Sequence, residues 1–412
     1  MSARSASFSL AQERKIVSIL GAVQFVNVLD FMMVMPLGPD FATALGIETA
    51  HLGWVGGSYM AAASVSGLVG SFFLDRHDRK QALLWCMAGL GVGTVLGGFA
   101  TGFGTLIAAR VFAGLFGGPA SALTFSLAAD VVPNERRGRA MAILMSAFAI
   151  ASVFGVPAGL ELARLGGWRA PFFGVGGVAF LVFLSSIWGL PVMRGHVARA
   201  LVEHPLKAAK AMLVRREVWY AYGCMAAAMV GGFLMMPNMA AYFQFNLAYP
   251  REKLALLYLV GGLTSFSLMI VSGRLIDRLG ASVVGGFATT SLVAVTYFGF
   301  ARAPSPLPAG AIFVGFMAAM GIRGVATTAL ASRVPDAHER ARFVSFMSVC
   351  QHAASAFGAF LSAAFLRAGA GGLLVGMERV AWTSIGFSSF IMVFMIPLER
   401  RARRLDKVSN VA

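Results

Sequence analysis

Long apolar runs separated by short polar breaks make up most of the chain. Charged residues, glycines and prolines divide it into about twelve runs, each close to the ~20 residues that an α-helix needs to cross the hydrocarbon core of a bilayer. The runs show no alternation of period two, which argues against a membrane barrel. The pattern therefore predicts an all-α integral membrane protein. Its twelve transmembrane helices are expected over residues 16–38, 52–74, 81–102, 105–129, 140–163, 170–191, 218–246, 253–275, 282–301, 308–331, 342–367 and 373–397.

The composition supports a lipid environment. The 412 residues are 58% hydrophobic and 13% charged, whereas soluble domains are typically about 25% charged. Such a chain cannot cover itself with polar surface in water. The first run is too long for the core of a signal peptide, and no convincing cleavage site follows it, so we expect it to remain as a span. Cys86, Cys224 and Cys350 lie within apolar runs, which indicates packing residues rather than a disulfide framework or a metal site.

The placement of the basic residues predicts the orientation. With twelve spans, both termini lie on one side of the membrane, and 25 of the 34 Lys and Arg residues fall on that side. Seven fall on the opposite side, and Arg110 and Arg323 lie inside spans. The positive-inside rule therefore places both termini in the cytoplasm, with the chain in the inner (cytoplasmic) membrane. The net charge of +16 thus indicates orientation and attraction to anionic lipid, not binding of nucleic acid.

Two short segments recur at one fixed distance along the chain. SFFLDR (71–76) resembles GRLIDR (273–278), and VVPNERRGRA (131–140) resembles RVPDAHERAR (333–342). In both pairs the matching Asp or Pro residues are 202 positions apart. Two independent matches at one offset indicate a duplication of six spans.

The duplication predicts how the chain is organised. We expect an N-terminal six-helix bundle over 1–191, a basic cytoplasmic connector over 192–217, and a C-terminal six-helix bundle with a short basic tail over 218–412. Duplicated bundles of this kind are typical of transporters, whose substrate site lies near the midplane where the halves meet.

The loop after the second expected span carries a family resemblance. SFFLDRHDRK (71–80) resembles the G-x-L-A-D-R-x-G-R-K signature of the major facilitator superfamily, and the resemblance covers essentially the whole chain. The matching residues are Asp75, Arg76, Arg79 and Lys80, while Ser71 and Asp78 stand where the family usually has glycines. The resemblance implies the major facilitator fold of two six-helix bundles.

Two further segments resemble motifs of proton-coupled members. LIAARVFAGLFGG (106–118) is similar to L-x-x-x-R-x-x-Q-G, with Arg110 in place and Ala113 where the family usually has glutamine. SVFGVPAGLELARLGGWRAPF (152–172) resembles the Gly-Pro antiporter motif. Its motif residues would be Gly155, Pro157 and Gly159. This resemblance implies the drug–proton antiporter branch, which contains bacterial sugar-, nucleoside- and drug-efflux permeases.

Asp30 is a charged residue in the middle of the apolar run QFVNVLDFMMVMPLGP (24–39). An aspartate at the centre of a bilayer helix costs roughly 2.5–3.5 kcal/mol on insertion scales, so such residues generally have a function. Gln24, Asn27 and Asp30 share a sector of about 120° on a helix, and we expect them to line a polar cavity. Asp30 would then bind and release a proton as conformation changes its pKa. The alternative is a structural ion pair with no part in turnover.

Arg110 and Arg323 are the other two charges inside spans. Arg110 cannot deprotonate at usable pH, so it would anchor an anion or control the pKa of a carboxylate such as Asp30; alternatively it packs against backbone carbonyls. At the repeat offset Asp30 corresponds to Gly232 and Arg110 to Ile312, so the shared scaffold requires neither charge. Arg323 is a candidate contact for an anionic substrate, unless it reaches the membrane surface instead.

Further polar residues are candidates for a gate or for the substrate cavity. The resemblance implies a charge relay of Asp75, Arg79 and Asp130 that holds the halves together on the cytoplasmic side, with Arg76 and Lys80 in the same gate; alternatively, these charges only fix orientation. Single polar residues in helices are usually satisfied locally, but four of them could also line the cavity: Asn238, Gln244, Gln351 and His352.

Together these features predict a secondary active transporter that exports a small organic molecule by proton antiport with alternating access. The sequence has no G-x-x-x-x-G-K-[ST] loop for ATP, so we expect the proton gradient to be the energy source, with no cofactor and no metal. The expected partners are a small-molecule substrate, protons and the lipid bilayer, with the protein acting as a monomer. The alternatives are a symporter or facilitator importing a metabolite, and a membrane-embedded enzyme, although the six histidines are scattered.

Overall fold

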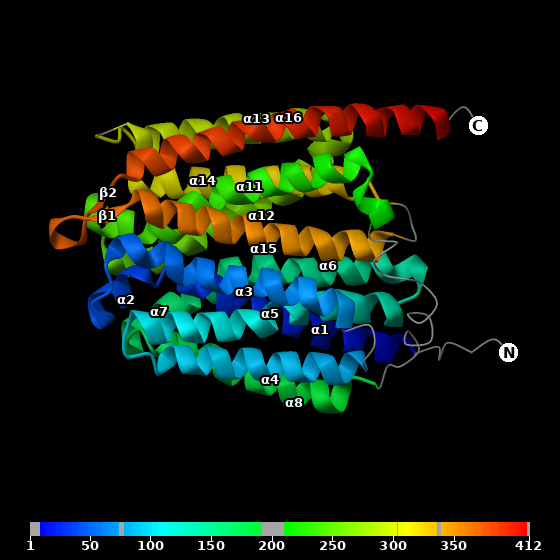
Figure 1. Ribbon diagram of the computed structural model, residues 1–412, viewed down its shortest axis with the longest axis horizontal. Helices are drawn as coiled ribbons and strands as arrows, with labels where there is room; N and C mark the ends of the chain where they lie inside the picture. Colours follow the sequence, from blue (N-terminus) through cyan, green and yellow to red (C-terminus); the bar gives the residue numbers. More distant parts are fainter. Residues whose placement is uncertain (1–8, 74–77, 192–209, 303, 336–338, 410–412) are drawn as a thin grey trace.

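The chain folds into a bundle of long helices that run side by side. The computed structural model describes residues 9–73, 78–191, 210–302, 304–335 and 339–409. Helix α1 begins and helix α16 ends at the same end of the bundle, which we call the terminal end (Figure 1). The short helix α2 and the strands β1 and β2 lie at the opposite, distal end (Figure 1).

The N-terminal half of the chain contains these elements: α1 (Leu10–Val34), α2 (Gly38–Leu45), the 3₁₀ turn η1 (Thr49–His51), α3 (Leu52–Phe73), α4 (Arg79–Gly98), α5 (Phe103–Val131), α6 (Asn134–Ile150), the π-helical segment η3 (Ala151–Gly155), α7 (Val156–Gly166) and α8 (Ala170–Gly189). Residues 192–209, most of the expected connector, lie outside the described part of the chain.

The C-terminal half contains a corresponding set: α11 (Arg216–Ala241), η4 (Tyr242–Asn246), η5 (Arg251–Lys253), α12 (Leu254–Leu279), α13 (Ala281–Thr296), η6 (Tyr297–Ala301), α14 (Ala309–Ala331), α15 (Arg340–Phe365), β1 (Arg367–Ala368), η7 (Ala370–Gly372), β2 (Leu374–Val375) and α16 (Met377–Ser409).

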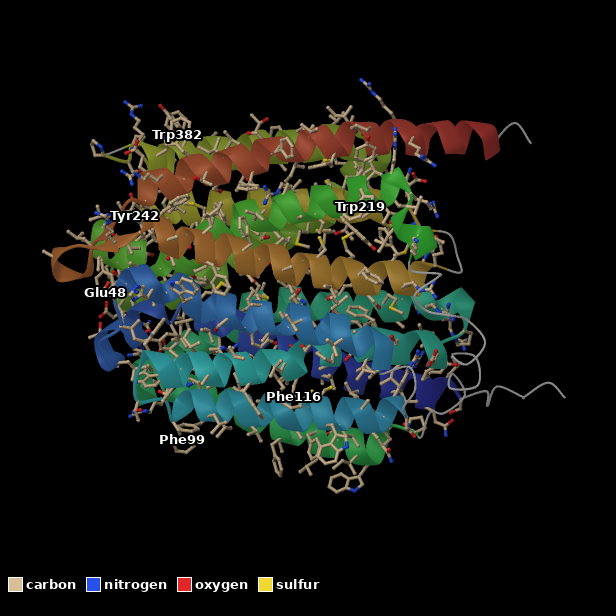
Figure 2. The ribbon with its side chains drawn as sticks, in the orientation of Figure 1. Glu48, Phe99, Phe116, Trp219, Tyr242 and Trp382 are labelled. Atoms are coloured by element: carbon tan, nitrogen blue, oxygen red, sulfur yellow. The ribbon has the colours of Figure 1, made fainter. Side chains whose placement is uncertain are left out.

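These helices confirm the predicted all-α membrane architecture. Within the described residues, eleven helical segments are long and apolar enough to cross a membrane. The one expected span that is not among these eleven is the second, 52–74, which forms the 22-residue helix α3. Glycine, serine and tyrosine lower its mean hydropathy. Large apolar side chains on the outside of the bundle suit contact with lipid. Phe99 and Trp382, which are 65% and 51% exposed, point away from it on opposite sides (Figure 2).

Local sequence signals explain where several helices begin and end. Ser9 and Gln12 form a capping box at the start of α1. Pro36 follows the end of α1 and Pro39 opens α2, so the chain turns as the two prolines predict. Asp78, which replaces a glycine of the family signature, caps α4 by accepting a hydrogen bond from the Lys80 backbone N–H at 2.8 Å.

The predicted start of the last span was wrong. We predicted a helix from residue 373, but Arg367–Ala368 and Leu374–Val375 form two short antiparallel strands, and α16 begins at Met377. Gly371, Gly372 and Gly376 have φ values of 67°, 83° and 98°, which end helical geometry there. The strands are too short for period-two alternation to be visible in the sequence.

The two halves contact each other through glycines on α3 and α12. A Cβ added to Gly53 of α3 would lie 2.3 Å from the Ala359 carbonyl oxygen of α15. A Cβ added to Gly262 of α12 would lie 3.1 Å from the Ser152 carbonyl oxygen in η3. We call these two helix crossings the seam. Since α3 and α12 are repeat equivalents, the same contact is made twice.

The apolar core shows where along the bundle the halves are joined. One hydrophobic cluster includes Leu29 and Met33 of α1 together with Leu234 and Met239 of α11. These residues belong to the distal halves of their helices. A second cluster, around Met225 and Phe343, consists of residues from the C-terminal half. The halves therefore share a core toward the distal end.

Candidate functional site

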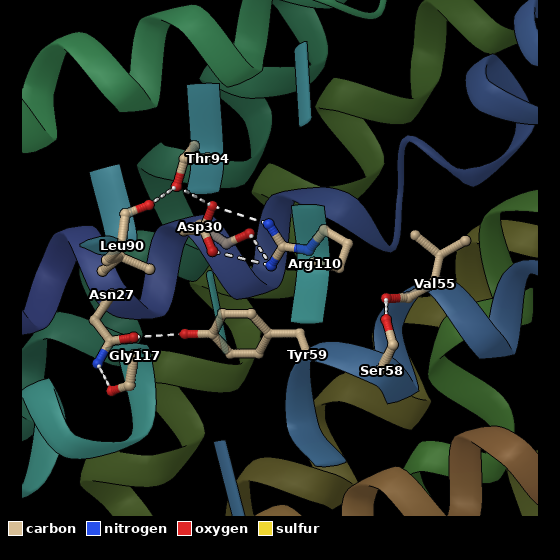
Figure 3. A network of polar contacts seen from close by, with 9 residues as sticks. All are labelled: Asn27, Asp30, Val55, Ser58, Tyr59, Leu90, Thr94, Arg110 and Gly117. Atoms are coloured by element: carbon tan, nitrogen blue, oxygen red, sulfur yellow. Dashed lines mark hydrogen bonds and ion pairs between the residues drawn. The ribbon is translucent and has the colours of Figure 1, made fainter. Parts of the chain in front are cut away.

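A buried ion pair joins α1 to α5 in the N-terminal half (Figure 3). Arg110 donates from Nη1 to Asp30 Oδ1 at 3.0 Å and from Nη2 to Asp30 Oδ2 at 2.9 Å. The Asp30 side chain is 0% exposed and that of Arg110 is 1% exposed. Asp30 and Arg110, which lie in separate spans and have no charged counterpart in the repeat, therefore neutralise each other. Their two parallel hydrogen bonds have the geometry that a guanidinium and a carboxylate favour.

Helix α4 supplies a third polar contact to the same carboxylate. Thr94 Oγ1 lies 2.7 Å from Asp30 Oδ1 and 2.8 Å from the Leu90 carbonyl oxygen (Figure 3). Thr94 is fully buried. A hydroxyl that can donate to either oxygen can remain hydrogen-bonded when the charge on Asp30 changes.

Helix α3 adds an aromatic residue under the arginine. The Arg110 guanidinium carbon lies 4.7 Å from the ring centre of Tyr59, within the range of a cation–π contact. The Tyr59 hydroxyl donates to Asn27 Oδ1 at 2.7 Å, and Asn27 Nδ2 donates to the Gly117 carbonyl oxygen at 2.8 Å (Figure 3). The site is thus a network of polar groups from α1, α3, α4 and α5.

Tyr59 and Thr94 were not identified from the sequence. Each is a single polar residue in a run rich in glycine and apolar residues, and its distance along the chain from Asp30 gives no indication of contact. Polar residues on neighbouring spans were the available signal, but which spans are neighbours is a tertiary property.

The polar stripe of α1 does not line a cavity in this structure, and we correct that prediction. Asn27 and Asp30 are 6% and 0% exposed and are bonded within the N-terminal half. Gln24 is 9% exposed, and its Oε1 accepts a hydrogen bond from the Ser121 hydroxyl of α5 at 3.2 Å. The stripe faces other helices of the same bundle because those helices supply its hydrogen-bond partners.

Arg323 is buried in the C-terminal half, so the alternative that it reaches the membrane surface is wrong. Its side chain is 1% exposed in α14. Nη1 donates to the Ser388 hydroxyl of α16 at 3.0 Å, and Nη2 donates to the Ala228 carbonyl oxygen of α11 at 3.0 Å. In the described part of the chain no carboxylate forms an ion pair with it. It is a buried cation held by neutral acceptors.

The remaining cavity candidates differ in their surroundings. Asn238 is fully buried between α11 and α15, and its Nδ2 donates to the Leu234 carbonyl oxygen and to Ser362 Oγ. Its Oδ1 has no hydrogen-bond partner in the described part of the chain. Gln244 donates to the Ala240 carbonyl oxygen of its own helix. Gln351 and His352 on α15 are partly exposed, and over the described ranges their side chains form no hydrogen bond.

The described gate residues contact each other within one half. Arg79 Nη1 lies 2.5 Å from Asp130 Oδ2, which joins α4 to α5. Lys80 donates from Nζ to the Ile187 carbonyl oxygen of α8 at 2.7 Å. Asp75 and Arg76 lie outside the described residues. These contacts of Arg79 and Lys80 lie within the N-terminal bundle, and the role of the relay as a cytoplasmic latch between the halves stays a prediction.

The antiporter-like residues lie against α1 close to Asp30. A Cβ added to Gly155 would lie 2.6 Å from Leu29 Cδ1, and Gly159 faces Met33 at 3.7 Å. Pro157 is the second residue of α7, directly after the π-helical segment η3, so the span is irregular at the motif. The motif allows α1 and this span to approach closely.

The family model of the Major Facilitator Superfamily matches residues 20–359, most of the chain. The chain belongs to the Major Facilitator Superfamily. Members of this superfamily are transporters and not enzymes, and they need no cofactor.

Curated relatives of this superfamily member include proteins named for resistance and for transport. It is 28% identical over 272 residues to the chloramphenicol resistance protein of Streptomyces lividans, covering 64% of this chain and 67% of that protein. It is 27% identical to the inner membrane transport protein YdhP of Escherichia coli K12, covering 63% of this chain and 65% of the relative. The matched regions span about two thirds of these relatives.

Solved structures show the same Major Facilitator fold. A bacterial homolog of the human lysosomal transporter Spinster, in an inward-facing and unoccupied conformation, has a TM-score of 0.73 at 16% identity and covers 96% of this chain and 99% of its own. The D-xylose–proton symporter has a TM-score of 0.73 at 15% identity, covering 94% and 97%. At these identities the likeness concerns the fold alone.

Proposed function

We propose that this transporter exports a small organic molecule from the cytoplasm by proton antiport with alternating access. The observation that carries the proposal is the buried Asp30–Arg110 pair, with side chains 0% and 1% exposed and hydrogen-bonded to a network from four helices. A titratable carboxylate at this depth generally has a function in transport proteins.

Protonation of Asp30 would change the forces between α1 and α5. The two charge-assisted hydrogen bonds from Arg110 lose the negative partner, while Arg110 itself stays charged. Tyr59 and Thr94 then supply alternative contacts for the arginine and the neutral carboxyl group. Binding and release of a proton would thus alter how tightly the two helices are held together.

Helix α1 is placed to pass this change on to the seam. Leu29, next to Asp30, lies against Gly155 of η3, and Ser152 and Val153 of the same segment lie against Gly262 of the other half. A shift of α1 therefore acts on the segment that joins the two halves. This arrangement gives the antiporter-like motif a mechanical role in coupling.

Direction and substrate class are inferred from the motif and from the relatives. The antiporter-like G-V-P-A-G segment and a relative named as a chloramphenicol resistance protein both favour export of a drug or metabolite. Gln351 and His352 keep exposed surface on α15, so we propose that they contact the substrate. Arg323 would contact an anionic group only after leaving Ser388 and Ala228.

The proposal includes orientation and assembly. The excess of basic residues on the side of the termini would place the terminal end in the cytoplasm of an inner membrane. The distal contacts would then close the outer side. We also propose that the protein functions as a monomer driven by the proton gradient.

Transport into inverted membrane vesicles tests the proposal. Drugs, sugars, nucleosides and organic acids are screened with an acidic lumen and without a pH gradient. Antiport predicts uphill uptake that requires the gradient, whereas a symporter would not accumulate substrate under these conditions. Asp30→Asn should abolish the gradient-driven uptake but leave the protein folded, and the exposed control Glu48→Gln should retain it. Unchanged uphill uptake by Asp30→Asn would overturn the role of this residue.

A further inference from the structure

An ion pair at the distal end joins the two halves of the molecule. Arg251 donates from Nε to Asp40 Oδ1 at 3.0 Å and from Nη2 to Asp40 Oδ2 at 3.0 Å. Asp40 lies in α2 of the N-terminal half, and Arg251 begins η5 of the C-terminal half, 211 positions later. The parallel hydrogen bonds fix the orientation of both side chains.

Arg251 is also tied to a second element of the N-terminal half. Its Nη2 lies 3.4 Å from the Leu160 carbonyl oxygen of α7. Around this contact charges of both signs lie on the two halves: Glu161 and Arg164 of α7 pair with each other and lie near Arg251 and Glu252 of η5. One arginine of the C-terminal half therefore holds both α2 and α7 in place.

The exposure of this pair differs from that of Asp30–Arg110. The Asp40 and Arg251 side chains are 24% and 22% exposed, whereas those of Asp30 and Arg110 are 0% and 1% exposed. Groups that water already reaches lose little hydration on pairing, so separating them carries a small cost. Such a pair suits a contact that forms and breaks in every transport cycle.

We propose that Asp40 and Arg251 form a reversible latch that closes the distal end of the transport path. The latch stabilises the state described here and opens when the halves separate at that end. At the repeat offset Asp40 corresponds to Tyr242 and Arg251 to Thr49, so the duplicated scaffold does not require the pair. The proposal rests on alternating access in the proposed function, but not on proton coupling at Asp30.

The latch makes a prediction about conformation. Asp40→Asn and Arg251→Gln should each raise the ratio of distally open to distally closed molecules by about fivefold, the effect expected of a partly exposed pair. Arg251→Lys should have an intermediate effect because lysine cannot make both parallel hydrogen bonds. The double exchange Asp40→Arg with Arg251→Asp should restore the original ratio.

Distances between spin labels measure this ratio directly. Labels at exposed Ala44 of α2 and exposed Arg367 of β1 report the separation of the halves at the distal end, in the full-length protein with its three cysteines replaced by alanine. The matched control is Arg136→Gln. Arg136 binds Glu13 with three contacts of 2.9–3.2 Å, but that pair joins α1 to α6 within one half, so the distal distance should not change.

The outcomes separate the latch from the proposed function. An unchanged distance distribution in Asp40→Asn and Arg251→Gln would overturn the latch, whatever Asp30→Asn does to transport. If the exchange variant does not fold, Asp40→Cys with Arg251→Cys provides a second test. A thiol cross-linker should then stop transport and a reductant should restore it, and transport that continues in the cross-linked protein would contradict the proposal.

Discussion

At the scale of single residues, the chain treats its buried charges in two different ways. Asp30 and Arg110 neutralise each other across 80 positions of sequence. Arg323 instead binds a hydroxyl and a backbone carbonyl and remains a net positive charge inside the C-terminal half. A buried pair can change its charge by taking up a single proton, whereas an isolated arginine cannot. For this reason we propose that the proton-binding function lies in the N-terminal half.

Removing one member of the pair should be more harmful than removing both. Arg110→Leu leaves the Asp30 charge buried without a counter-charge, and we expect the folded state to lose about 3–5 kcal/mol. Asp30→Asn combined with Arg110→Leu should recover most of this loss. Thermal unfolding of the purified variants in detergent provides the measurement. Equal stability of the single and double variants would show that the charges do not depend on each other.

The ring and the hydroxyl of Tyr59 should contribute separately. Tyr59→Phe keeps the ring beneath Arg110 but removes the donor to Asn27 Oδ1, which should cost about 1 kcal/mol. Tyr59→Leu removes both contacts and should cost more. Denaturation measurements on the two variants test this order. A Phe variant as unstable as the Leu variant would contradict a separate role for the ring.

At the scale of helices, glycine determines how closely the halves approach. The two crossings of the seam place a glycine of α3 and a glycine of α12 against backbone atoms of the opposite half. A methyl group at Gly53 must separate the helices, since a backbone carbonyl cannot rotate away as a side chain can, whereas at Gly262 a shift of a few tenths of an ångström is enough. The seam is therefore sensitive to the smallest substitutions.

Gly53→Ala should open the seam. Its Cβ would lie 2.3 Å from the Ala359 carbonyl oxygen, so α3 and α15 must separate. We expect the distal distance between labels at Ala44 and Arg367 to lengthen. Gly177→Ala on α8, where an added Cβ meets no atom within 4 Å, is the control. An unchanged distance in Gly53→Ala would show that the crossing can yield without separation of the halves.

At the scale of the whole molecule, the duplication gives two halves with equivalent helices, but the charged residues in the two halves differ. We call the two sets of equivalent helices the frame. The seam is made twice by equivalent helices, but the Asp30 network and the Asp40–Arg251 pair each occur at positions whose repeat partners are neutral. We propose that this frame supports rocking of the halves, and that the unshared charges determine what drives the motion and which state is stabilised.

The predicted orientation can be tested by labelling from one side. A cysteine at Glu48, exposed at the distal end, should react with an impermeant thiol reagent added to intact cells. A cysteine at Arg340, exposed at the start of α15, should react only after the membrane is opened. The reverse pattern would contradict the proposed cytoplasmic position of the termini and, with it, the direction of export.

The sequence by itself determined the class of the protein and the residues that stand out from it. Apolar run length, the 202-residue repeat and the motif residues were sufficient for the family and for the unusual charges Asp30, Arg110 and Arg323. These features are local or periodic, so they can be found without knowing which helices are neighbours. The sequence also placed most helix ends to within a few residues, because charged residues, glycines and prolines mark the breaks between apolar runs.

The tertiary structure decided which charges and helices meet. In the folded chain Asp30 pairs with Arg110, and Thr94 and Tyr59 contact this pair. The polar stripe of α1 faces other helices of the N-terminal bundle, and Asp40 pairs with Arg251. Each of these contacts joins residues far apart in the chain, and any apolar span could have served as a neighbour. The choice depends on the close packing of small residues across several helices at once, which no single segment of sequence specifies.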